Sequence, residues 1–152
     1  AMRTILTALI LTVATQVGAA CSNLCDRNWW KTATEADVQA ELDAGADVMT
    51  QNRSANTPLH YAVRSNTPAN IQALLDAGAD VMARNKDGDT PLHRAVYLVF
   101  CCKPRVLQAL LAAGADAKAK NKKGKTPWDY AQRNATLKGT KGYWALNDAQ
   151  YI

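Results

Sequence analysis

The 152-residue sequence lacks the side-chain patterns of nucleophilic and nucleotide-binding enzymes. It contains only two histidines, and neither forms a set with a serine and a carboxylate at the spacing that nucleophilic catalysis needs. It also has no glycine-rich loop of the kind that holds a phosphate. These absences argue against an enzyme, and we expect neither a cofactor nor a metal.

A membrane-spanning run is also missing from the start of the chain. The apolar stretch at residues 5–14 is shorter than the roughly 20 residues that span a bilayer. Arg3 precedes it, and the small residues Gly18, Ala19 and Ala20 follow. A basic start, a short apolar run and a small-residue exit are typical of a secretory signal peptide. We expect residues 1–20 to be removed and residues 21–152 to be periplasmic or secreted.

A lipid anchor remains an alternative to soluble export. Cys21 directly follows the signal-like segment, as the modified cysteine of a lipoprotein does. However, Gly18 stands three positions before it, where lipoprotein signals favour a larger aliphatic residue. We expect contact with a membrane only if Cys21 is lipidated.

Cysteine is scarce, with four residues in the chain. In an oxidising compartment an even number indicates disulfides. Cys21 and Cys25 are close enough in sequence to pair, and we expect this bond. Cys101 and Cys102 are adjacent and could not pair with each other without strain, so their redox state stays open. A metal site of these two with His93 would lack the ligand spacing of ordinary zinc sites.

Two phrases recur along the chain with one period. Thr-Pro-Leu-His stands at 57–60 and again at 90–93, and an altered copy, Thr-Pro-Trp-Asp, stands at 126–129. A second phrase, Leu-Asp-Ala-Gly-Ala-Asp, stands at 42–47 and 75–80 and, as Leu-Ala-Ala-Gly-Ala-Asp, at 111–116. A period of about 33 residues with this tetrapeptide is typical of ankyrin repeats. From residue 22 to residue 152 the sequence resembles that family.

The resemblance implies an all-α solenoid of antiparallel helix pairs joined by short β-hairpin-like fingers. We expect one domain, divided into an N-terminal cap (22–51), two repeats (52–84 and 85–120) and a closing repeat (121–152). A closing helix is expected at 142–149, where aromatic side chains would cover the last layer. These side chains and one leucine are Trp128, Tyr130, Tyr143, Trp144 and Leu146.

Local signals support each helix. Thr57 and Thr90 stand where N-caps belong, each followed by a proline suited to the first helical position. Gly78 and Gly114 follow the second helices, where a left-handed C-terminal cap is needed. By resemblance to the family, His60 and His93 have a structural role and tie adjacent turns together.

In this family, partners bind to the fingers and to the inner surface of the first helices. The corresponding residues here are Arg53, Ser54, Asn56, Arg64, Ser65, Lys86, Asp87, Asp89, Tyr97, Leu98, Lys122, Lys123, Lys125 and Arg133. Ala55 departs from the family pattern, because it occupies the place of a turn glycine, and we expect the first finger to be distorted.

The repeat at 85–120 is three residues longer than the repeat at 52–84, and the extra residues lie within 97–103. This segment includes Phe100, the only phenylalanine. The extra residues could form an additional helical turn that packs locally. Alternatively they could form an exposed apolar ridge, in which case Phe100 joins the binding residues.

Charge is divided unevenly along the chain. Residues 21–80 carry eight acidic and four basic side chains, whereas residues 81–152 carry five acidic and thirteen basic ones. The leading hypothesis is an exported, monomeric, non-enzymatic module that binds a protein partner, an acidic one if the basic end takes part. The alternative is a lipid-anchored or surface-adsorbed protein whose basic finger binds anionic lipid or a polyanion. We expect no nucleic acid, because the protein would be exported.

Overall fold

The computed structural model describes residues 22–64, 67–97 and 104–152. The signal-like segment, Ser65, Leu98, Phe100 and three of the cysteines lie outside these ranges. The predictions that rest on them therefore stay predictions.

The described chain consists of short helices joined by loops, with no strand assigned among its residues. Two 3-10 turns, η1 (Asn23–Cys25) and η2 (Trp29–Lys31), come first. The α-helices that follow are α1 (Glu35–Asp43), α2 (Pro58–Ala62), α3 (Pro68–Asp76), α4 (Pro91–Tyr97), α5 (Pro104–Ala112), α6 (Pro127–Ala131) and α7 (Lys141–Asp148). None of the described helices is long and apolar enough to cross a membrane.

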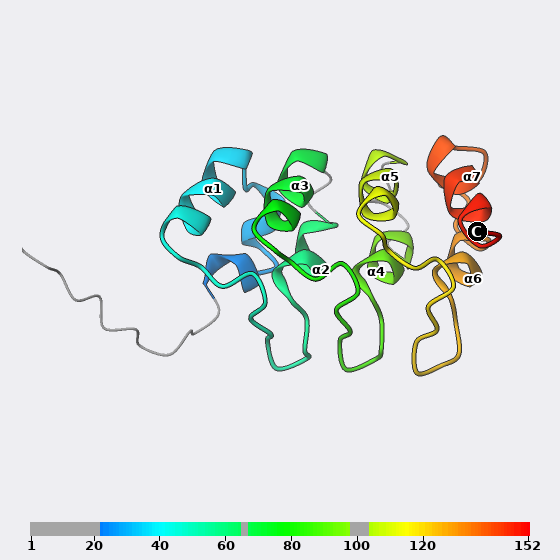
Figure 1. Ribbon diagram of the computed structural model, residues 1–152, viewed down its shortest axis with the longest axis horizontal. Helices are drawn as coiled ribbons and strands as arrows, with labels where there is room; N and C mark the ends of the chain where they lie inside the picture. Colours follow the sequence, from blue (N-terminus) through cyan, green and yellow to red (C-terminus); the bar gives the residue numbers. More distant parts are fainter. Residues whose placement is uncertain (1–21, 65–66, 98–103) are drawn as a thin grey trace, which may run out of the picture.

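The helices form two layers of a solenoid, as Figure 1 shows. The outer layer is α1, α3, α5 and α7, each packed against the next. The inner layer is α2, α4 and α6, and η1 packs against α2 at its start. Long loops project from the inner layer, and the two ends of the described chain lie at opposite ends of the array (Figure 1). This is the all-α ankyrin solenoid that the sequence predicts.

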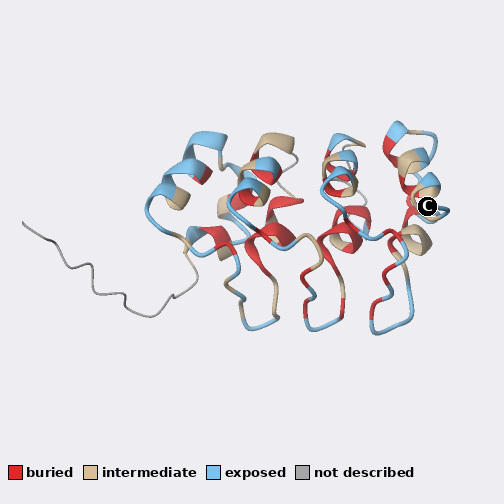
Figure 2. Cartoon of the chain, viewed as in Figure 1, coloured by how far each residue is buried: buried red, intermediate tan, exposed pale blue. Residues whose placement is uncertain are grey.

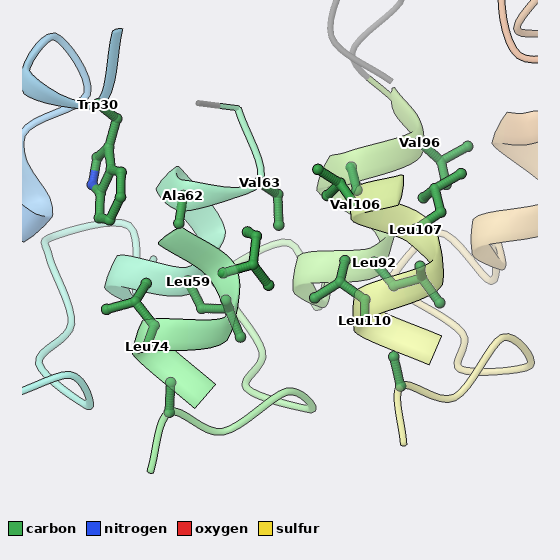
Figure 3. Packing of buried hydrophobic residues seen from close by; sticks show 14 of the residues in the cluster. Trp30, Leu59, Ala62, Val63, Leu74, Leu92, Val96, Val106, Leu107 and Leu110 are labelled. Atoms are coloured by element: carbon green, nitrogen blue, oxygen red, sulfur yellow. The ribbon is translucent and has the colours of Figure 1, made fainter. Parts of the chain in front are cut away.

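One continuous apolar core runs between the layers. Leu59 and Leu92 from the inner helices meet Leu74 and Leu110 from the outer helices, and all four are fully buried (Figure 3). Trp30 extends this core to the N-terminal end of the array, where its indole N–H donates to the Leu24 carbonyl at 2.7 Å. A single repeat could not bury these side chains, so neighbouring repeats stabilise one another.

The C-terminal end of the array is covered by fewer aromatic side chains than the sequence predicts. Leu146 on α7 is buried, and Trp128 packs against Tyr143 with ring centroids 4.7 Å apart. Trp144, however, is 54% exposed, so it does not help to seal the end. Only one face of a helix of eight residues can reach the core, and Gly142 and Leu146 occupy that face on α7.

The fingers are the loops 52–56, 85–89 and 121–125. Each closes with the same hydrogen bond, from the amide of its first residue to the carbonyl of its last, at 2.9–3.1 Å. The expected distortion of the first finger is wrong, because Ala55 adopts the left-handed conformation of its glycine counterparts. Its φ of 57° compares with 75° at Gly88 and 69° at Gly124. The first finger thus keeps its shape at the cost of backbone strain.

Candidate functional site

An asparagine at the base of each finger holds the turn together. Asn52, Asn85 and Asn121 recur at equivalent positions, and the Oδ1 atom of each accepts two backbone N–H bonds within its own finger, at 2.9–3.0 Å. These three residues were not among those predicted from the sequence, although they recur at the same spacing as the Thr-Pro motifs. Two of them, Asn85 and Asn121, are buried, so their amides act as internal parts of the loop.

Neighbouring fingers are bonded to each other through their backbones and side chains. The Lys86 amide donates to the Ser54 carbonyl at 2.9 Å, and the Lys122 amide donates to the Asp87 carbonyl at 3.0 Å. The Asn121 side chain donates to the Asp89 carboxylate at 2.7 Å. The fingers therefore present their tips as one connected edge of the solenoid.

The two histidines bridge each inner helix to the next finger. His60 Nε2 lies 3.0 Å from the Asp89 carbonyl, and His93 Nε2 lies 2.9 Å from the Lys125 carbonyl. On the other side of each ring, Nδ1 accepts the backbone N–H of the preceding threonine, Thr57 or Thr90, at 3.2 Å. Nδ1 must therefore be unprotonated, and Nε2 donates to the carbonyl.

Both rings are held in the neutral form. Burial lowers the pKa of His60 and of His93, because it penalises the imidazolium. Each ring uses both nitrogens inside the fold, so neither has a nitrogen left for a metal or for proton transfer to a substrate. In this geometry the histidines shape the fingers that carry the candidate binding residues.

In the last inner helix, Asp129 occupies the position of the histidine and bonds to the cap threonine in its place. Its carboxylate accepts the Thr126 backbone N–H at 2.8 Å and the Thr126 hydroxyl at 3.1 Å, which completes a capping box. The backbone bond from Thr126 lowers the pKa of Asp129, as do the nearby Lys125 and Arg133. The carboxylate therefore preserves the helix cap, but it makes no bond of the kind by which His60 and His93 reach the next finger.

A hollow lies where the second and third fingers meet α4 and α6. Its part beside the fingers has a volume of about 140 Å³ and is polar. The residues lining that part are Asp87, Asp89, Arg94, Tyr97, Asn121, Lys123 and Tyr130. An adjoining part of about 170 Å³ reaches toward the helices and is more apolar. The residues lining it are Val96, Tyr97, Tyr130, Arg133 and Asn134.

Two tyrosines are shared by both parts of this hollow. Tyr130 is half-buried and fixed, because its hydroxyl accepts from the Asn121 amide at 3.0 Å and its ring meets His93 edge-on. Tyr97 stands against it at right angles, with ring centroids 5.4 Å apart, and is 59% exposed. A large aromatic side chain that is held on one side and open on the other is suited to contact with a partner.

The structure brings together some of the predicted binding residues and leaves others apart. Asp87, Asp89, Tyr97, Lys123 and Arg133 line the hollow. The remaining charged fingertip residues are exposed outside it, namely Arg53, Lys86, Lys122 and Lys125.

The other predicted residues lie in the first repeat, away from this hollow. Ser54 is exposed at the tip of the first finger, whereas Asn56 is half-buried and accepts from the Asn85 side chain at 3.0 Å. Arg64 follows α2 and is half-buried. Arg94 and Tyr130 line the hollow and were missed, although the repeat register alone places them on the inner surface of the first helices.

Only one member of the expected cysteine pair lies within the described residues. Cys25 is the last residue of η1. The other cysteines, Cys21, Cys101 and Cys102, lie outside the described residues. The pairing of Cys25 with Cys21 therefore stays a prediction.

The register of the fingers and helix pairs agrees with the comparison to known families. The model for ankyrin repeats, in three copies, matches residues 32–121, which is more than half of the chain. The chain belongs to the ankyrin repeat family. No curated protein matches it. The helix pair α6–α7 lies beyond the matched range and continues the same two layers (Figure 1). Ankyrin repeats are in general non-enzymatic modules for protein–protein interaction.

Proposed function

We propose that this ankyrin protein is an exported, non-enzymatic module that binds a protein partner through its fingertips and the adjoining face of the inner helices. The observation that carries the proposal is the hollow around Tyr97 and Tyr130. It combines an exposed aromatic side chain with charged residues from two repeats. Tyrosine and arginine are the residue types enriched at the energetic centres of protein interfaces.

The exposure of the fingers supports the same proposal. Figure 2 shows exposed residues at the finger ends, and buried residues along both arms of the second finger and one arm of the third. These two fingers are fixed by the buried side chains of Asn85 and Asn121 and by the buried histidines, so their tips need little ordering when a partner binds. A surface that is rigid before binding loses less conformational entropy in the complex.

A test of this proposal uses the mature protein as bait in the exported proteome of its own host. Tyr97→Ala removes the exposed ring from the hollow, and Tyr151→Ala removes another exposed tyrosine ring, which lies outside it. We expect wild type and the Tyr151→Ala control to retain the same partner, and Tyr97→Ala to lose most of it. Equal retention by all three proteins would contradict the proposed binding face.

Export itself is proposed from the first twenty residues, and mass spectrometry of the mature N-terminus tests it. Cleavage beside Ala20 with an unmodified Cys21 would support soluble export. A diacylated Cys21 would support the lipid-anchored alternative. Peptide mapping without reduction would at the same time show whether Cys25 is paired with Cys21.

The alternative function, adsorption of a basic finger to anionic lipid or a polyanion, rests on the third finger. Lys122, Lys123 and Lys125 are all exposed there. Sedimentation with vesicles of anionic phospholipid tests it, since each basic residue near such a surface contributes about 1 kcal/mol. Binding to these vesicles by the unlipidated protein, abolished by charge reversal of the three lysines, would favour this alternative.

A further inference from the structure

Aromatic and arginine side chains alternate at two repeat positions, one on the inner helices and one at or just beyond their C-terminal ends. At the fourth residue after each Thr-Pro threonine stand Tyr61, Arg94 and Tyr130. At the seventh residue stand Arg64, Tyr97 and Arg133. Each row therefore alternates along the solenoid, and the two rows alternate in opposite order. Four of these six residues line the hollow between the second and third fingers.

The cations of this hollow are held by no direct side-chain bond among the described residues, although Arg133 lies near enough to Asp129 to help lower the pKa of that carboxyl. Arg94, Lys123 and Arg133 form no ion pair and no side-chain hydrogen bond with any part of the chain that the structure describes. Moreover, Nε of Arg94 is buried there without a hydrogen-bond partner. A buried donor left unbonded costs free energy, so an acceptor that draws the guanidinium toward it would be favoured.

The hollow has fewer carboxylates than cations, and one of its two carboxylates already accepts a hydrogen bond within the fold. Asp89 already accepts from the Asn121 side chain at 2.7 Å. Asp87 is exposed, and only its backbone groups are bonded, through the Asn85 side chain and the Lys122 amide. Three available cations thus face one available carboxylate, within a half of the chain that already carries excess positive charge.

We propose that this hollow holds an acidic segment of the protein partner, with an aromatic or large aliphatic side chain packed on Tyr130 beside Tyr97 and carboxylates against Arg133 and Lys123. The inference rests on the proposed function and adds the chemistry of the partner to it. The apolar part of the hollow, about 170 Å³ in volume, receives the side chain. The polar part and its rim receive the carboxylates, which guanidinium groups bind with two parallel hydrogen bonds.

The same arrangement disfavours other classes of partner. Asp87 and Asp89 interrupt the line of cations between the first and third fingers, so a polymer with evenly spaced phosphates or sulfates would meet repulsion there. A basic segment would meet Arg94 and Lys123 in the same hollow as those carboxylates. An acidic segment with carboxylates on either side of one apolar side chain can meet the cations of the site and avoid Asp87 and Asp89.

Short blocked peptides, labelled with a fluorophore at one end, test this proposal with the full mature protein. The probe is a run of glutamates around one tryptophan. Its two comparison peptides replace the tryptophan with alanine or the glutamates with lysines. We expect fluorescence anisotropy to detect binding of the glutamate–tryptophan peptide, weaker binding of the alanine version and none of the lysine version. Higher salt should weaken binding, because partly exposed charges are screened.

Variants of the protein locate the site. Arg133→Glu and Tyr97→Ala should each weaken the peptide by about fivefold or more, as expected for residues central to an interface. Their matched controls are Lys138→Glu and Tyr151→Ala, which change exposed residues outside the hollow and should leave binding unchanged. Circular dichroism and thermal melts of all four variants exclude loss of fold as the cause.

Several outcomes would overturn the inference. Stronger binding of the lysine peptide, equal binding of the alanine version, or no effect of Arg133→Glu and Tyr97→Ala would each do so. So would preferential binding of heparin or single-stranded DNA, or self-association of the protein that Tyr97→Ala abolishes. If Tyr97→Ala loses the native partner but the acidic peptide does not compete with it, the proposed function stands and this inference fails.

Discussion

Ala55 stands where the other two fingers have a glycine, yet the first finger keeps the same shape. Its φ of 57° lies in the left-handed region, where a side chain strains the backbone. Ala55→Gly should therefore stabilise the protein by up to about 1 kcal/mol, and an increase in the urea midpoint would show it. An unchanged or lower midpoint would mean that the strain is relieved elsewhere or that the alanine methyl group makes a compensating contact.

Gly88 provides the opposite case at the equivalent position. A Cβ added there would lie 2.9 Å from the Lys122 backbone nitrogen, which is too close for the third finger to keep its place. Gly88→Ala should destabilise the protein by about 1 kcal/mol or more, because strain and a backbone clash act together. Backbone amides of the third finger should also exchange hydrogen faster in Gly88→Ala, whereas Ala55→Gly should leave their exchange rates unaltered.

The two buried histidines make stability depend on pH. Their pKa values are lowered in the folded protein, so the unfolded chain binds protons more readily as the pH falls. Their contribution is complete above about pH 6.5, the ordinary histidine pKa, and is lost progressively below it. Urea midpoints measured on both sides of about pH 6.5 should therefore fall with acidification, and a His60→Gln, His93→Gln double variant should show a smaller fall. An equal fall in the variant would assign the effect to other groups.

At the scale of the structural element, each finger is a small rigid unit built around one asparagine. In the third finger, Asn121 accepts two backbone N–H bonds and donates to Asp89 and Tyr130. Asn121→Ala should cost about 2 kcal/mol, since several buried groups lose their partners. Faster hydrogen exchange at the amides of Lys123 and Lys125 would locate the loss. Asn147→Ala, on the half-buried end of α7, is the control for replacing an asparagine.

The helices could be predicted from the sequence because their signals are local. Proline after threonine and apolar spacings of three and four residues set α2, α4 and α6. The closing helix was expected at 142–149 and lies at Lys141–Asp148, with Thr140 as its N-cap. The shape of the first finger was predicted wrongly, because a family glycine was taken as necessary where an alanine can adopt the same conformation under strain.

The candidate site was only partly predictable, for a different reason. Repeat register identifies which positions face the inner surface, and it found Tyr97 and Arg133. The same register also places Arg94 and Tyr130 on that surface, but it does not show which neighbours in space share a hollow, and this is what sets those two residues apart. Nor does register show that Asp89 is already engaged by Asn121, which alters the charge that a partner meets.

For the whole molecule, the decisive property is the uneven charge of the solenoid. The acidic N-terminal half and the basic C-terminal half should orient an approaching acidic partner toward the third finger. Such attraction extends over about 8–10 Å at physiological salt, so it acts mainly on the rate of association.

Reversal of the three fingertip charges tests that role. Lys122→Glu, Lys123→Glu and Lys125→Glu together should slow association of the glutamate–tryptophan peptide severalfold at low salt and much less at moderate salt, as stopped-flow measurements would show. Thermal stability should change little, because these side chains are exposed and their backbone bonds to Asp87 and His93 do not depend on the side chain.

The matched control reverses three exposed lysines elsewhere in the basic half, Lys118, Lys138 and Lys141. It changes the net charge by the same amount, so a deficit confined to the fingertip variant would show local attraction and not a general effect of charge. If the fingertip variant instead binds at the wild-type rate at both salt concentrations, the third finger is a solvated loop. Binding would then centre on Tyr97 and the residues that follow it, where Leu98 and Phe100 stand in the sequence.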